Sequence, residues 1–102
     1  MKPQSDYVAS RCNYVYMCII AADGTFETGP RGWDCVRSAA GTYVITHNIG
    51  NQVYAPIPRA IAASDFLINA TVEALTENTI TVGVYNATAK IDNRITLTIL
   101  VG

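Results

Sequence analysis

The sequence contains a single histidine, His47, and three cysteines, and these side chains could form a nucleophile and its base. Nucleophilic catalysis needs the base beside the nucleophile, with a third group orienting the base. No local signature of that chemistry surrounds any of the cysteines. His47 also ends an alternating run, GTYVITHNIG at 41–50, directly before a turn. We therefore predict that His47 hydrogen-bonds to the turn at 48–50 and has no catalytic role.

The cysteines are Cys12, Cys18 and Cys35, and their spacings match no common zinc pattern. We predict that the cysteines are reduced thiols, mostly buried as small hydrophobic side chains. One disulfide among them remains an alternative. Reduced thiols fit a chain that folds in a reducing cytosol. We expect no cofactor.

The acidic residues offer a second chemistry, because paired carboxylates hydrolyse glycosides. Most of them fall at expected turns, where Asp stabilises the local backbone. Only Asp34 and Glu73 lie in the middle of expected strands, and the sequence alone does not bring two carboxylates together. We therefore predict that the protein is not an enzyme.

Charge and hydropathy exclude two classes of partner. The chain has 7 Lys and Arg against 8 Asp and Glu, with no basic cluster, which argues against nucleic-acid binding and against an anionic membrane surface. No apolar run approaches the roughly 20 residues of a membrane span. The first ten residues, MKPQSDYVAS, carry no apolar core of a secretory signal.

Aromatic residues make binding a better prediction than catalysis. The chain has one tryptophan, Trp33, and six tyrosines, and sugar rings stack on exposed aromatic faces. The alternatives remain that Trp33 anchors the core and that the tyrosines pack along strands with their hydroxyls at the rim. The second alternative applies to Tyr14, Tyr16, Tyr43 and Tyr54.

The elements that would position these residues are strands throughout. Residues 1–12 read as a lead-in or linker and 13–102 as one domain. Short runs of β-forming residues recur every 8–12 positions between Gly, Pro, Asn and Asp turns, which predicts an all-β, antiparallel β-sandwich of about seven or eight short strands. Asp23-Gly24 predicts a two-residue hairpin. The expected strands are 13–22, 25–28, 33–38, 42–47, 52–63, 66–75, 79–85 and 94–101.

The side-chain pattern also predicts positions within the sandwich. Pro56 and Pro58 mark an edge strand or an extended segment, because proline donates no ladder hydrogen bond. Tyr43 and Ile45 should point into the core. Several apolar residues instead fall on faces that should be outward, so a second face is buried, either in a subunit interface or against the edge of the other sheet. These residues are Val36, Val44, Leu67 and Leu100.

One motif adds a resemblance to a known class of proteins. The order and spacing of eight residues resemble the C-terminal head or knob domains of bacteriophage tail fibres, tail needles and related virion appendages. The residues are Gly32, Trp33, Arg37, Gly41, Tyr43, Ile45, His47 and Tyr54. The resemblance covers about 17–60; beyond it only the strand rhythm agrees, and residues 1–12 do not match.

The resemblance implies a homotrimeric knob at the tip of a virion fibre, assembled in the host cytoplasm, that attaches to a glycan or protein receptor on the bacterial surface. The outward apolar faces would then form the trimer interface. Three copies of His47 near a threefold axis could hold a metal ion, but the chain lacks an H-x-H pair and we predict no metal site.

Receptor contacts are expected on loops at one end of the sandwich, because loops carry binding on a rigid scaffold. The candidates are Arg31, Trp33, Asn48, Asn51, Asn78, Lys90 and Asn93. Two alternatives to receptor binding remain: a structural trimerisation cap or capsid decoration, and, less favoured, a small glycan-active enzyme.

Overall fold

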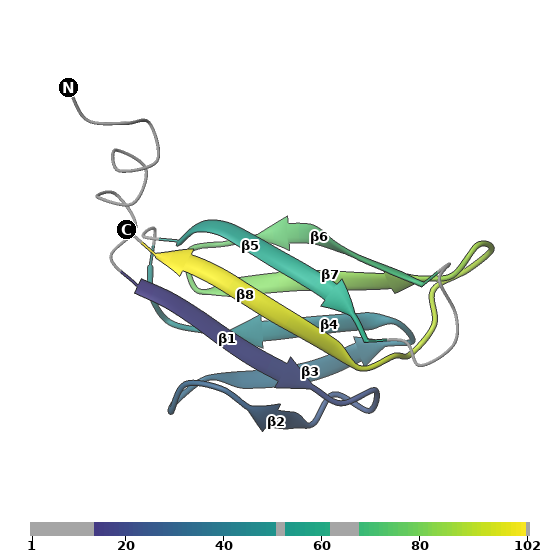
Figure 1. The fold of residues 1–102 in the computed structure, drawn as a ribbon, viewed down its shortest axis with the longest axis horizontal. Helices are drawn as coiled ribbons and strands as arrows, with labels where there is room; N and C mark the ends of the chain where they lie inside the picture. Colours follow the sequence, from purple (N-terminus) through teal and green to yellow (C-terminus); the bar gives the residue numbers. More distant parts are fainter. Residues whose placement is uncertain (1–13, 51–52, 62–67, 102) are drawn as a thin grey trace.

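The computed structural model describes residues 14–50, 53–61 and 68–101, which form eight β-strands (Figure 1). The strands are β1 (Tyr14–Ile20), β2 (Phe26–Thr28), β3 (Asp34–Ala39), β4 (Thr42–Thr46), β5 (Val53–Ala60), β6 (Asn69–Leu75), β7 (Thr79–Tyr85) and β8 (Ile95–Val101). The expected lead-in lies outside the described residues.

The strands form two four-stranded sheets packed face to face. One sheet has the order β2-β1-β8-β5 and the other the order β3-β4-β7-β6; every neighbouring pair is antiparallel. This arrangement confirms the predicted antiparallel β-sandwich. We call the first sheet A and the second sheet B.

Alternating side chains from both sheets build the core between them, as the period of two requires. Tyr43 and Ile45 of β4 are fully buried, as predicted, and His47 continues their face with only 4% of its surface exposed. The fully buried hydrophobic residues are Cys18, Ile20, Tyr43, Ile45, Ile80, Val82, Val84, Ile95, Leu97 and Ile99.

The β1–β2 turn differs from the predicted two-residue hairpin. The Ala21 N–H donates to the Thr25 carbonyl at 2.8 Å, so three residues lie between this pair. Only Gly24 takes a positive φ, at 94°, whereas a two-residue type I′ turn would need two such residues. Asp23 instead accepts a hydrogen bond from the Thr25 N–H at 2.9 Å.

The prolines place β5 at the edge of sheet A, next to β8, and confirm the prediction of an edge strand. The Ile61 N–H donates to the Arg94 carbonyl on the β8 side. Because donors alternate along a strand, Pro56 and Pro58 occupy the positions that face the free edge, where a missing N–H leaves no gap in the ladder.

The alternation breaks in β6. Its pairing with β7 shifts between Val72 and Ala74, so Glu73 is the extra residue of a β-bulge. Ala74 is therefore exposed, although simple alternation from Ala70 and Val72 would turn it inward, because the bulge reverses the faces that follow it. Leu67, expected to face outward, lies outside the described residues.

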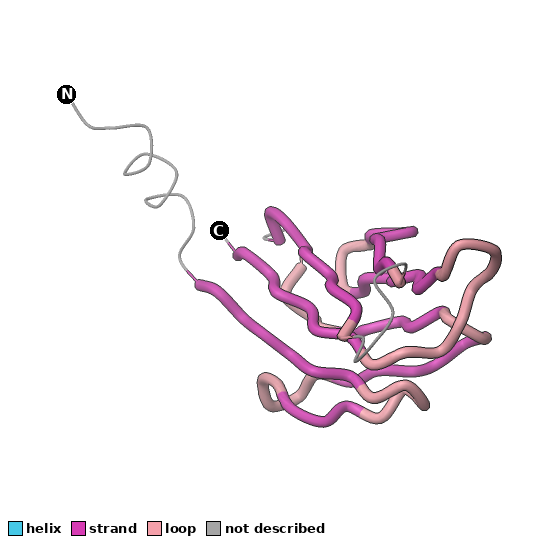
Figure 2. Tube along the Cα trace, turned by 45° about the vertical axis from the view of Figure 1, so that its right-hand side comes forward, coloured by secondary structure: helices cyan, strands magenta, loops and turns pink. Residues whose placement is uncertain are grey.

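Different connections lie at the two ends of the sandwich (Figures 1 and 2). β1 begins and β8 ends at the same end, where Tyr14 pairs with Val101; we call this the terminal end. The connections 29–33 and 76–78 also lie there. The connections 21–25 and 86–94 lie at the opposite end, which we call the loop end. Within the described residues, no helix is long and apolar enough to cross a membrane.

Candidate functional site

The structure separates the predicted receptor residues into two groups. Four of them lie at the terminal end, and two lie at the loop end in the β7–β8 connection. Asn51 lies outside the described residues. The terminal group consists of Arg31, Trp33, Asn48 and Asn78; the loop-end group consists of Lys90 and Asn93.

At the terminal end, His47 contacts two connections and the ring of Trp33. Its Nδ1 accepts a hydrogen bond from the Ile49 N–H at 3.0 Å, which confirms the predicted contact with the turn. The backbone N–H of His47 donates to the Asn78 carbonyl at 2.9 Å. The Trp33 ring lies 5.9 Å from the His47 ring and 5.4 Å from the Tyr16 ring. Trp33 is partly buried and its ring packs against the core.

The histidine is held in its neutral form. Because Nδ1 accepts a hydrogen bond, the ring proton is on Nε2, which is buried and has no hydrogen-bond partner in the structure described. Burial lowers the pKa of His47, since desolvation disfavours the charged ring. Across the described ranges, no three His, Cys, Asp or Glu side chains gather as a metal site.

At the loop end, an ion pair fastens the β7–β8 connection to sheet B. Asp92 accepts from Arg37 Nε at 2.9 Å and Nη2 at 2.8 Å, and from the Gly41 N–H at 2.8 Å. These contacts lower the pKa of Asp92, with the Arg37 hydrogen bond as the largest cause. The two-pronged geometry fixes the orientation of the loop as well as its position.

The buried Tyr43 supports the same loop from below. Its hydroxyl donates to the Ala22 carbonyl at 2.6 Å and accepts from the Asn93 N–H at 3.2 Å. The Asn93 side-chain amide donates to the Ile61 carbonyl at 3.0 Å. Asn93, predicted as a receptor contact, thus joins three connections to one another.

Lys90 belongs to a second polar group on the outer face of sheet B, which we call the Glu73 cluster: Thr42, Glu73, Tyr85 and Lys90. Lys90 Nζ donates to Glu73 Oε1 at 2.8 Å and to Thr42 Oγ1 at 3.0 Å. The Tyr85 hydroxyl donates to Glu73 Oε2. Lys90 Nζ also lies 5.5 Å from the centre of the Tyr85 ring, within the range of a cation–π contact.

Backbone features build the Glu73 cluster. The bulge in β6 directs the Glu73 carboxylate over Gly83, where a Cβ would stand 2.6 Å from Oε1. Gly83 is therefore needed because any side chain there would displace the carboxylate. An isolated bridge between Tyr85 and Lys90 returns the loop to the sheet, and the Asn86 side chain accepts from the Ala89 N–H at 2.8 Å.

The electrostatics of the Glu73 cluster suit binding better than proton transfer. The pKa of Glu73 is lowered, chiefly by the Lys90 hydrogen bond, and the pKa of Lys90 is raised, chiefly by the same bond. The Glu73 hydrogen bond raises the pKa of Tyr85. All three shifts move away from neutral pH, whereas a general acid or base works best with a pKa near the operating pH.

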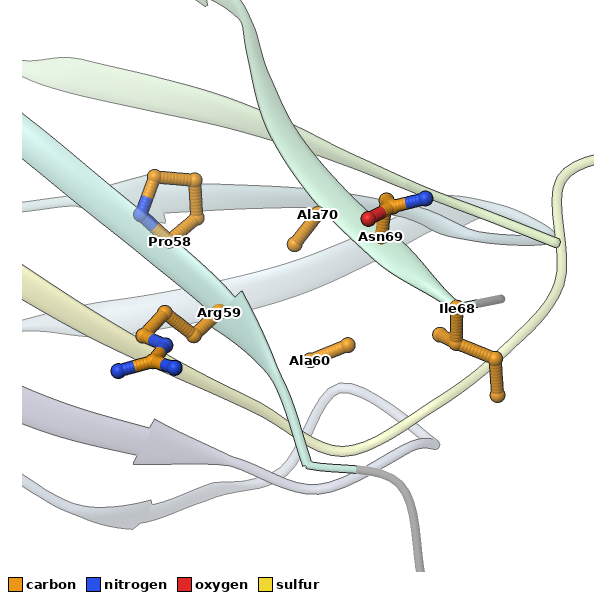
Figure 3. Close-up of a pocket in the computed structure, with 6 residues that line it drawn as sticks. All are labelled: Pro58, Arg59, Ala60, Ile68, Asn69 and Ala70. Carbon is orange, nitrogen blue, oxygen red and sulfur yellow. The ribbon is translucent and has the colours of Figure 1, made fainter. Parts of the chain in front are cut away.

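A hollow of about 270 Å³ lies between β5 and β6, but polar side chains do not converge on it. In Figure 3 the Arg59 guanidinium and the Asn69 amide point away from each other. A binding site usually combines an enclosed space with a few convergent polar groups. The Glu73 cluster has the convergent groups, so it is the better candidate. The hollow is lined by Pro58, Arg59, Ala60, Ile68, Asn69 and Ala70.

Sequence reasoning found only part of this site. Lys90 was predicted as a receptor residue, and Glu73 stood out as an acid within a strand, but Tyr85 and Thr42 were given no role. A usable signal was present in TVGVY at 81–85, where Gly83 occupies an outward position between two buried valines. An outward glycine in a strand indicates a close approach by another group.

No family model, curated protein or solved structure matches this chain.

Proposed function

We propose that this protein is a self-associating attachment domain of a virion appendage, of the bacteriophage tail-fibre or needle kind, that binds a receptor on a bacterial cell. The resemblance around His47 motivates the kind of protein. The observation that carries the assembly is a patch of exposed apolar side chains on the outer face of sheet A.

That face has an ordered layout. Met17 of β1 pairs with Thr98 of β8, and Thr98 pairs with Ile57 of β5, so the three form one outward row. Val15 stands beside Leu100 in the next row. Val15, Met17 and Ile57 are 61%, 57% and 46% exposed. Contiguous exposed apolar surface on a soluble protein commonly marks an interaction site.

A second copy of the chain is the occupant we propose for this face. The two rows contain no charged side chain in the residues described, and the exposed Arg59 stands in the neighbouring row opposite Thr96. Two such faces can therefore meet without burying an unpaired charge if Arg59 stays at the rim of the contact. Val36 and Val44, which the sequence also placed in a possible subunit interface, pair with each other on the outer face of sheet B. We therefore assign the trimer interface to sheet A, with Leu100 as the one residue kept from the sequence prediction.

The receptor would then bind at the loop end. Tyr14 enters at the terminal end, so a shaft that preceded it would join there and the loop end would face the cell. Lys90 is the expected residue best placed for contact, whereas Trp33 and Asn48 would lie on the shaft side. The loop end is also fastened by Arg37–Asp92, and a preorganised surface binds at a lower entropic cost.

The first test is the solution mass, measured by light scattering behind a sizing column. We expect three times 11.0 kDa for the natural chain, and a lower mass for Met17→Lys. Val36→Lys is the matched control, because Val36 is 58% exposed on the other sheet. A monomeric natural chain, or equal effects of the two variants, would contradict the proposed interface.

The second test is adhesion of the fluorescently labelled chain to a panel of bacterial strains. Attachment predicts saturable binding to some strains that unlabelled protein displaces. A trimer that binds none of them would favour the alternative role as a trimerisation cap or capsid decoration.

A further inference from the structure

More backbone features hold the Glu73 cluster in place than the small stability of a surface ion pair would explain. Surface ion pairs such as Lys90–Glu73 contribute little to the free energy of folding. Three features nevertheless hold this pair in place: the bulge in β6, the glycine at position 83, and the bridge that joins Lys90 to Tyr85. Bulges often direct a side chain at functional sites. We propose that the Glu73 cluster binds the hydroxyl groups of a neutral sugar, which rests on the proposed attachment function and names its ligand class.

The hydrogen-bonding capacity left over in the cluster defines that ligand. Lys90 Nζ has three donors; two bond Glu73 and Thr42, and the third lies beside Tyr85. The Thr42 hydroxyl, which accepts from Lys90, keeps its own proton to donate. The Glu73 carboxylate has further lone pairs beyond the two contacts from Lys90 and Tyr85. A free donor therefore stands beside several free acceptors.

A sugar hydroxyl matches this mixture because each one donates and accepts. A phosphate or a carboxylate only accepts, and it would meet the Glu73 charge directly. An ammonium group only donates, and it would meet Lys90. The opposite charges of Glu73 and Lys90 thus disfavour ionic ligands of either sign and leave a neutral polyhydroxyl ligand as the best fit.

The surface around the cluster also suits a flat ring. Gly83 pairs with Thr42 of β4 on one side and Thr71 of β6 on the other, in one outward row. The Glu73 carboxylate covers the glycine, so a ring would lie on the carboxylate, with small threonine side chains on either side of it. Beside it, the partly exposed Tyr85 offers an aromatic ring at the edge of the row. Sugar rings combine hydroxyl hydrogen bonds with stacking on such rings.

The test is a titration of the full chain followed by two-dimensional amide NMR. The probes are methyl α-glucopyranoside and methyl α-galactopyranoside, with glucuronic acid and glucosamine as charged comparators. We expect at least one neutral glycoside to shift the amides of Gly83, Tyr85 and Lys90. The charged sugars should bind at least about tenfold more weakly, because a site built for hydroxyl groups rejects a mismatched group strongly.

Glu73→Gln should weaken the neutral glycoside at least about tenfold, the size expected for one hydrogen bond to a charged group. Glu27→Gln is the matched control, because Glu27 forms a comparable exposed ion pair with Arg94 at 2.6 Å; it should leave binding unchanged. The amide spectrum itself shows whether each variant is folded.

Three results would overturn the sugar site: no shift with either neutral glycoside, equal binding of the charged sugars, or binding that survives Glu73→Gln. These failures differ from failure of the attachment function. Adhesion to cells that persists in Glu73→Gln would remove the sugar site and keep attachment. Glycoside binding by a chain that adheres to no cell would keep the site and remove attachment.

Discussion

Replacing Tyr43 by phenylalanine tests whether one buried hydroxyl holds the loop end together. The change removes a single oxygen and keeps the aromatic ring in the core, so it opens no large cavity. It breaks the bond to the Ala22 carbonyl and the bond from the Asn93 N–H. Two connections therefore each lose one hydrogen bond to the sheet at the same time.

The expected loss follows from those two bonds. Each contributes about 1 kcal/mol net, so the free energy of unfolding should fall by about 2 kcal/mol. For a domain of this size the melting temperature should fall by about 10 °C. The 3.5 Å contact with Asp92 is too long to add to this figure.

The assay is equilibrium urea unfolding, at one fixed protomer concentration because association would add to the apparent stability. Tyr85→Phe is the matched control: its hydroxyl also donates one hydrogen bond, to the Glu73 carboxylate. That bond lies at an exposed site where water can replace it, so the loss should be much smaller than for Tyr43→Phe. Equal losses in the two variants, or a loss below about 0.5 kcal/mol for Tyr43→Phe, would refute the reasoning.

Three further outcomes are expected. Burial lowers the pKa of His47 below its ordinary 6.5, so the unfolded chain takes up the proton first as the pH falls. The free energy of unfolding should therefore be level above about pH 7 and fall below about pH 6.5. Urea titrations of His47→Gln should lack this component of the fall. Burial raises the pKa of Cys18 to about 11 and that of Cys35 to about 12, so mass spectrometry should find both resistant to iodoacetamide at pH 8 until urea is added; rapid alkylation of the folded chain would contradict the packing. The Lys90 hydrogen bond holds the pKa of Glu73 low, so a carboxyl-carbon NMR titration of Lys90→Met should show that pKa rising toward its ordinary value.

The fold could be predicted from sequence because its signals are local. Alternation in β4, β7 and β8 identifies their inward faces without any knowledge of partners, and the structure buries Ile45, Val82 and Leu97 accordingly. The paired prolines of β5 likewise placed it at an edge. Each of these inferences needs only a residue and its near neighbours.

The candidate site was only partly predictable because it depends on distant pairs and on one slipped residue. Arg37 and Asp92 are 55 positions apart, and nothing local to either indicates the other. The bulge at Glu73 interrupts a clean alternation from 68 to 74 that reads as regular strand. The carboxylate of this extra residue bonds Lys90 and Tyr85, which lie on a different strand and its following loop, so the residues near Glu73 in sequence do not indicate these contacts.

β1 illustrates why the face of sheet A needed the structure. Its sequence, YVYMCII, is apolar at every position, so periodicity cannot tell which side is inward. The structure buries Cys18 and Ile20 and exposes Val15 and Met17. An antiparallel strand with one face in water normally alternates apolar with polar residues, as β8 does with Thr96 and Thr98. A strand that is apolar on both faces, beside one that is not, agrees with the proposed second copy of the chain on the outer face of β1.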